Sequence, residues 1–254
     1  MKKITVCVLL AAMLICLTSC TDENEEPYTS LRIDQTTEEG TSGDAAFVNT
    51  SGDAYGVSTS GDAVYVDCIT VASLNDAAEK YGSAIKNEAG FIYSNSYYNY
   101  LTNTLITTNG DSWRLCDSDE IAEYTGIDVE KIKAFKNGDI TAAENEVSYC
   151  AMAYNYQTAS SIAVYYFNPA SYNISNMKAE DYLEIIASQY ENVEKSKVEF
   201  IGQSYAMIDI PASDERNRMV EYAIEKDGLL YCIAISLKDD MTYEEAASII
   251  GTVY

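Results

Sequence analysis

One two-residue turn constrains the fold of this chain more than any other feature. Asp227 and Gly228 lie between two runs rich in apolar and β-branched residues, at 220–224 and 229–237. An Asp-Gly pair between such runs is typical of a tight β-hairpin, because both central positions of that turn need a positive φ. The sequence therefore predicts an antiparallel hairpin near its C-terminal end.

The tight turn also predicts which residues of the hairpin face one another. With residue 226 opposite residue 229, the pairs on one face are all apolar: Ile224 with Tyr231, Tyr222 with Ile233, and Val220 with Ile235. The pairs on the other face are small or mixed: Ala223 with Cys232, and Glu221 with Ala234. We expect a full cover over the first face and a thinner or partial cover over the second.

Apolar spacing predicts further elements on either side of this hairpin. Helices are expected at 75–89, 118–124, 128–135 and 176–190, and strands at 113–116, 147–154, 161–167, 197–201 and 205–210. For 94–106 the period does not decide between a strand pair and a continued helix. A capping box at 242–245 predicts a last helix. Its core-facing residues are Ala246, Ala247, Ile249, Ile250 and Val253. Residues 64–254 are thus expected to form an α+β domain, an antiparallel sheet flanked by helices.

The first twenty residues have the pattern of an export signal. Lys2 and Lys3 precede an apolar run at 4–17 that is too short to span a bilayer comfortably. The segment Leu17-Thr18-Ser19-Cys20 resembles the lipobox of bacterial lipoproteins. That resemblance implies removal of residues 1–19, a lipid on Cys20, and anchoring to the outer side of a bacterial cell membrane. The alternative is an ordinary secretory signal with an incidental cysteine.

Residues 20–63 are predicted to be a tether. The segment is rich in Thr, Ser, Gly, Asp and Glu, and the pentapeptide Thr-Ser-Gly-Asp-Ala recurs at 41–45, 50–54 and 59–63. Such a composition buries too little apolar area to offset the entropy of ordering. We expect a flexible or partly extended acidic spacer. The alternatives are a segment that pairs with the edge of the domain and, much less favoured, a calcium-binding repeat.

Charge and composition exclude several classes of function. The formal net charge is -24, so we expect no nucleic-acid partner, because binding to phosphates depends on a basic surface. The chain contains no histidine, which rules out catalysis by Ser-His-Asp or Cys-His groups and any metal site built on imidazole. We expect no catalytic residue, no bound cofactor and no metal site.

Four cysteines remain after the signal and Cys20, and none belongs to a C-x-x-C pair: Cys68, Cys116, Cys150 and Cys232. Zinc or redox chemistry therefore has little support. An exported protein permits disulfides, and four cysteines allow three pairings. Apolar neighbours such as those of Cys150 and Cys232 equally suit buried, reduced thiols. The sequence leaves the two alternatives open.

Aromatic residues offer one candidate binding surface. The chain has 22 tyrosines and only five phenylalanines, with a cluster at Tyr97, Tyr98 and Tyr100. Exposed tyrosines often contact a partner protein or stack on sugars, so these three residues are candidate partner contacts. The alternative is that tyrosine replaces phenylalanine at half-buried strand positions. The single tryptophan, Trp113, is expected in the core.

The C-terminal part resembles the PsbP-like family, including its bacterial lipoprotein relatives. The resemblance spans 147–254 and rests on the helix at 177–190, the segment Val198-Glu199-Phe200-Ile201-Gly202-Gln203-Ser204-Tyr205, the hairpin and the closing helix. It implies an α/β/α sandwich that binds or assists other proteins without catalytic residues.

Two hypotheses of function follow. The first is a lipid-anchored, non-catalytic extracytoplasmic domain that binds a partner protein or envelope component through one face of its sheet. The alternative is a hydrolase of cell-wall polysaccharide that depends on carboxylates. The alternative requires two acids distant in sequence to meet in a pocket, one of them with a raised pKa.

Overall fold

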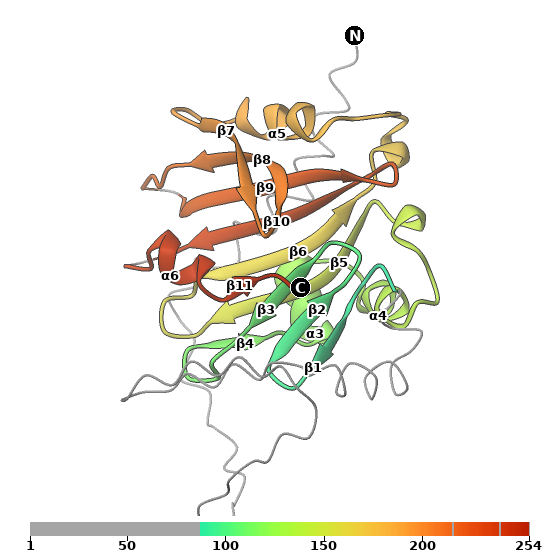
Figure 1. Cartoon of the computed structure of the whole chain (residues 1–254), viewed down its shortest axis with the longest axis horizontal. Coiled ribbons are helices and arrows are strands. Elements are labelled where there is room, and N and C mark those ends of the chain that lie inside the picture. Colours follow the sequence, from blue (N-terminus) through green and yellow to red (C-terminus); the bar gives the residue numbers. More distant parts are fainter. Residues whose placement is uncertain (1–86, 215, 239, 254) are drawn as a thin grey trace, which may run out of the picture. The chain divides into compact units, whose positions relative to one another are not determined.

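The computed structural model describes residues 87–253 apart from 215 and 239, and these residues form an α+β fold of two antiparallel sheets and four α-helices (Figure 1). The larger sheet has seven strands in the order β4-β5-β6-β10-β9-β8-β7. Its strands are β4 (Trp113–Leu115), β5 (Val147–Asn155), β6 (Ser161–Phe167), β7 (Glu194–Phe200), β8 (Gln203–Ile210), β9 (Arg218–Lys226) and β10 (Leu229–Leu237). The α+β prediction is confirmed.

A second, four-stranded sheet was not anticipated. It is ordered β1-β2-β3-β11. Its strands are β1 (Phe91–Tyr93), β2 (Ser96–Asn99), β3 (Thr104–Thr107) and β11 (Ile250–Gly251). The undecided stretch at 94–106 is therefore a strand pair. Strand β11 brings the two ends of the described chain together, because its Ile250 pairs with Ile106 of β3.

The predicted register of the C-terminal hairpin is confirmed pair by pair. Leu229 lies opposite Lys226, and all three apolar pairs fall where the turn places them. Their face packs against the small sheet, within one buried cluster that includes Tyr97 and Ile106. The Tyr231 hydroxyl donates a 2.8 Å hydrogen bond to Thr104 Oγ1, which joins the two sheets through the core.

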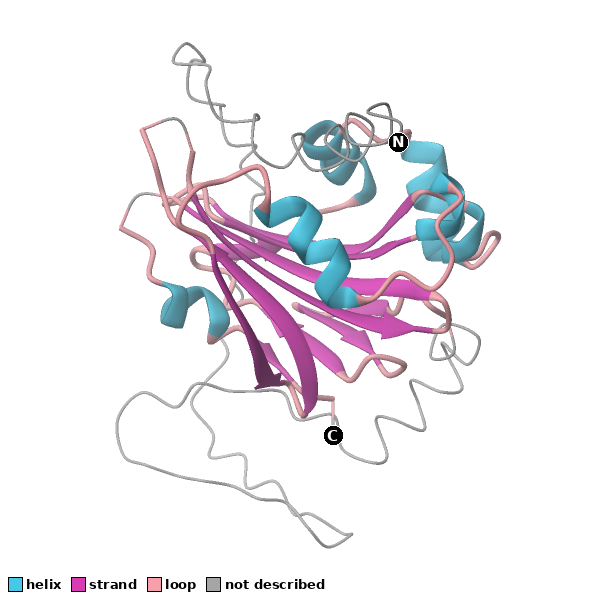
Figure 2. Cartoon of the chain, turned by 90° about the horizontal axis from the view of Figure 1, so that it is seen from above, coloured by secondary structure: helices cyan, strands magenta, loops and turns pink. Residues whose placement is uncertain are grey.

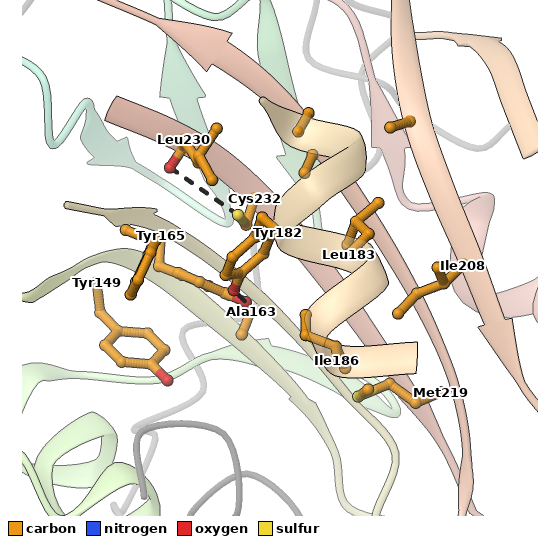
Figure 3. Close-up of a cluster of buried hydrophobic side chains, with 14 of the residues drawn as sticks. Tyr149, Ala163, Tyr165, Tyr182, Leu183, Ile186, Ile208, Met219, Leu230 and Cys232 are labelled. Atoms are coloured by element: carbon orange, nitrogen blue, oxygen red, sulfur yellow. Dashed lines mark hydrogen bonds between the residues drawn. The ribbon is translucent and has the colours of Figure 1, made fainter. Parts of the chain in front are cut away.

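The expectation of a thin cover over the opposite face is wrong. Helix α5 (Ala179–Ala187) lies on that face and buries Tyr182, Leu183 and Ile186 against the sheet (Figures 2 and 3). The small residues Ala223 and Cys232 leave the room that the bulky ring of Tyr182 needs, and both are fully buried. Small side chains on a strand thus accommodate a large covering side chain.

Helices flank the larger sheet on one side, and the small sheet covers the other. Helix α3 (Ser118–Thr125) contributes Ile121 to the same cluster as α5. Helix α4 (Val129–Asn137) lies beside β5. Helix α6 (Tyr243–Ala247) joins the small sheet, since Ala246 is buried in the second cluster. Short 3-10 turns occur at Ala142–Glu144 and Pro169–Tyr172.

The helix boundaries depart from prediction at three places. The helix predicted at 176–190 is limited to α5, and its neighbour Tyr190 is only partly buried. The last helix ends at Ala247, so Ile250 lies in a strand. The helix predicted at 75–89 lies outside the described residues except for 87–89, which form a turn.

A buried carboxyl group, Glu221, lies at the centre of the helix-covered face. It is 1% exposed, and the hydroxyls of Tyr165 and Tyr182 donate to its Oε1 at 2.5 and 3.2 Å. Figure 3 shows these two tyrosines, from β6 and α5, pointing toward one another. Burial raises the pKa of Glu221 to about 7, and the two hydroxyl hydrogen bonds oppose that rise.

Substitution of Glu221 should alter the pH dependence of stability. Because the folded pKa lies above the ordinary value, the folded chain keeps this proton to higher pH than the unfolded chain, and stability falls as pH rises toward 7. We expect a loss of about 2 kcal/mol in the free energy of unfolding between pH 5 and 8. No histidine titrates in this range. Guanidinium unfolding of Glu221→Gln should show this slope removed. An unchanged slope would contradict the assignment, and exposed Glu199→Gln is the matched control.

Two glycines with positive φ form a matched pair for a second test. Gly90 has φ +67°, and a Cβ there would overlap the Tyr98 carbonyl oxygen and come within 2.8 Å of the Tyr97 ring. Gly228 has φ +84° and no atom within 4 Å of the same position. We expect Gly228→Ala to cost about 1 kcal/mol of backbone strain. Gly90→Ala should cost clearly more in denaturant unfolding, and equal costs would contradict the packing at Gly90.

Candidate functional site

A cavity of about 390 Å³ lies where three segments meet at one end of the larger sheet. The segments are the β3–β4 connection, the β5–β6 turn, and the stretch that runs from the end of β10 through α6. Its lining is Asn109, Ser112, Trp113, Asn155, Gln157, Thr158, Asp240, Met241, Glu245, Ser248 and Ile249. The volume falls within the range of small-molecule sites in proteins.

Hydrogen bonds hold the walls of this cavity to one another. The Tyr156 amide donates to the Ser112 carbonyl at 3.1 Å, which ties the β5–β6 turn to the β3–β4 connection. Ser160 Oγ donates to the Lys238 carbonyl at 3.3 Å and accepts from the Lys238 amide at 2.9 Å. The Thr107 amide donates to the Ile249 carbonyl at 2.9 Å. The site is therefore built on fixed loops, which is typical of a pre-formed pocket.

Two asparagines line the cavity and bond to the backbone through their side-chain oxygens. Asn155 is 2% exposed, and its Oδ1 accepts from the amides of Gln157 and Thr158 at 2.9 and 3.1 Å. Asn109 Oδ1 accepts from three amides of its own turn, each at 3.3 Å. These bonds identify the oxygen of each side chain, so Nδ2 is the remaining end. Neither Nδ2 has a protein partner within the described part of the chain.

Carboxylates also line the cavity. Asp240 and Glu245 are exposed residues that line the cavity. Glu245 Oε2 accepts from the Thr242 amide and hydroxyl at 3.0 and 2.8 Å, which completes the capping box of α6. The hydrogen bond from the Thr242 amide has the larger effect and that from the Thr242 hydroxyl the smaller, and both lower the pKa of Glu245. This side chain is therefore an anion at neutral pH. No lysine or arginine is among the lining residues.

The described cavity does not meet the condition set for a carboxylate-dependent hydrolase. Its two acids are five residues apart in one segment, and the pKa of Glu245 is lowered. The carboxyl group with a raised pKa is Glu221, which lies in the core and does not line the cavity.

The predicted tyrosine contacts fall at different depths. Tyr97 and Tyr98 lie on β2 and are 1% and 6% exposed, so their rings are more deeply buried than the half-buried strand positions of the alternative. Tyr100 is half-buried beside Leu101, which is 39% exposed. Trp113 is 4% exposed, as predicted for a core residue, and also lines the cavity.

The described cysteines are buried thiols. Cys116, Cys150 and Cys232 are free, and Cys68 and Cys20 lie outside the described residues. Burial raises the pKa of Cys116 and Cys150 to about 12. Among the described residues, which leave out 215 and 239, no group of three or more acids or cysteines is placed to hold a metal ion. None of the helices formed by these described residues is long and apolar enough to cross a membrane.

Sequence analysis did not identify the site residues. Asn109 and Asn155 each begin a polar turn, at 109–112 and 155–158, and the side chain of each bonds to backbone amides two or three residues ahead. That signal predicts turns. It does not predict that the two turns converge on α6.

Comparisons with models of known protein families and with curated proteins found no match. Among solved structures, the chain is similar to the solution structure of cyanobacterial PsbP (CyanoP) from Synechocystis sp. PCC 6803, with 12% sequence identity and a TM-score of 0.34. The match covers 64% of this chain and 96% of that chain. At that TM-score, the α+β assignment rests on the strands and helices described above.

The thiols give a direct test of the core. We expect iodoacetamide at pH 8 to leave Cys116, Cys150 and Cys232 unmodified in the folded chain, because the reactive thiolate is suppressed and the sulfurs are covered. Without reductant, guanidinium should make all three reactive. Peptide mass spectrometry reads both states. Resistance to alkylation in guanidinium alone would indicate a disulfide and contradict the structure.

Proposed function

We propose that this chain is a bacterial lipoprotein, held through a lipid on Cys20 at the outer side of the cell membrane, whose domain binds an envelope component without catalysing a reaction. The anchor is inferred from the lipobox at 17–20 and the acidic tether that follows. Two or three acyl chains hold a protein at a membrane, whereas a single chain binds only marginally.

The observation behind the binding role is the cavity whose lining includes Asn155. The Asn155 amino group makes no hydrogen bond within the described residues and is not among the fully enclosed polar atoms, so it is open to a ligand that accepts from it. The sheet itself is a poor binding surface, because both faces of its central strands are buried. We therefore replace the expected sheet face with the cavity as the ligand site.

A partner protein is the second candidate, and one observation favours it. Within the described residues β1 is one of the two edge strands of the small sheet, and its Ile92 is 40% exposed. Leu101 and the half-buried Tyr100 belong to the connection between β2 and β3. An apolar edge strand is a ready template for a strand of another chain.

The anchor is tested by metabolic labelling with an alkyne analogue of palmitate in bacteria that express the full chain. The wild type should carry the label and sediment with membranes. Cys20→Ser should lose the label and leave the membrane fraction, whereas Cys68→Ser should keep both properties. An unlabelled wild type, or equal labelling of Cys20→Ser, would contradict the lipoprotein assignment.

A further inference from the structure

We propose that the cavity between the β5–β6 turn and α6 binds a neutral, polyhydroxylated ligand, one or two sugar rings of an envelope saccharide. This inference rests on the proposed binding role and names its ligand class. It does not depend on the lipid anchor.

The donors of the site favour hydroxyl oxygens as partners. The Asn155 side chain is locked by its two backbone bonds, so the position of Nδ2 is fixed before a ligand arrives. Asn109, in the β3–β4 connection, adds a second amino group to the lining residues. Each of these two amino groups has two N–H donors and accepts no hydrogen bond. The ligand must therefore supply several acceptor atoms within one small volume.

The acceptors of the site select against anions and simple cations. Asp240 and Glu245 add carboxylates to the lining, no cation is among the lining residues, and the whole chain has a net charge of -24. A phosphate or carboxylate ligand is repelled by this arrangement. An ammonium group satisfies the carboxylates but leaves the amide donors of Asn155 unpaired. A sugar hydroxyl donates and accepts at once, so it satisfies both sets.

The apolar part of the lining suits the carbon-bound face of a sugar ring. Trp113, Met241 and Ile249 line the cavity beside the polar groups. Such a mixture of apolar walls and a few directed polar groups is usual in ligand sites. Because Trp113 is the single tryptophan of the chain, it is also an intrinsic reporter of occupancy.

The experiment is a fluorescence titration of the full chain in detergent, excited at 295 nm so that only Trp113 responds. The probes are triacetylchitotriose and maltotriose as neutral sugars, sialyllactose as an anion and spermidine as a cation. Asn155→Asp keeps the oxygen that accepts from Gln157 and Thr158 but removes the donors. Asn137→Asp makes the same charge change at an exposed position on α4 and is the control.

We expect a saturable change with at least one neutral sugar and none with sialyllactose or spermidine. Asn155→Asp should weaken that binding at least tenfold with unchanged unfolding in guanidinium, and Asn137→Asp should bind as the wild type does. Equal affinity of Asn155→Asp and wild type, a response to the charged probes alone, or no response to any probe would overturn the inference. If the chain binds a neutral sugar but carries no palmitate label, the proposed lipid anchor is contradicted and the sugar-binding inference stands.

Discussion

The larger sheet needs an apolar cover on both of its faces, and the rest of the structure depends on how that need is met. Its central strands β6, β9 and β10 are buried on both sides. Helices α3 and α5 cover one face, and the small sheet covers the other. The small sheet is completed by β11, so the C-terminal end returns to hold the cover in place.

Tyrosines are the largest fully buried side chains among the described residues, and several of their hydroxyls, though not that of Tyr205, have hydrogen-bond partners in the core. A buried hydroxyl without a hydrogen bond is destabilising. Tyr231 donates to Thr104, and the pair Tyr165 and Tyr182 donates to Glu221. Glu221 thus supplies the acceptor that two buried hydroxyls require, which explains a carboxyl group at the centre of an apolar face.

Local sequence signals predicted the elements whose determinants are local. The Asp227-Gly228 turn predicted the register of the hairpin, and the capping box at 242–245 placed the start of α6. The small sheet was missed because its strands have two to four residues and its last strand lies far along the chain. The burial of Glu221 was missed because its partners are 56 and 39 residues away.

The candidate site depends on the same long-range assembly. Its turns are local, but the cavity exists only where they meet the segment at 240–249. The most direct test of its binding role is a two-dimensional ¹H–¹⁵N spectrum of the full chain, with the side-chain NH₂ signal of Asn155 assigned by its loss in Asn155→Asp. Addition of triacetylchitotriose or maltotriose should shift that signal and that of Asn109, with the side-chain amides of residues outside the cavity lining unmoved. Unmoved asparagine signals at saturating sugar would contradict the account.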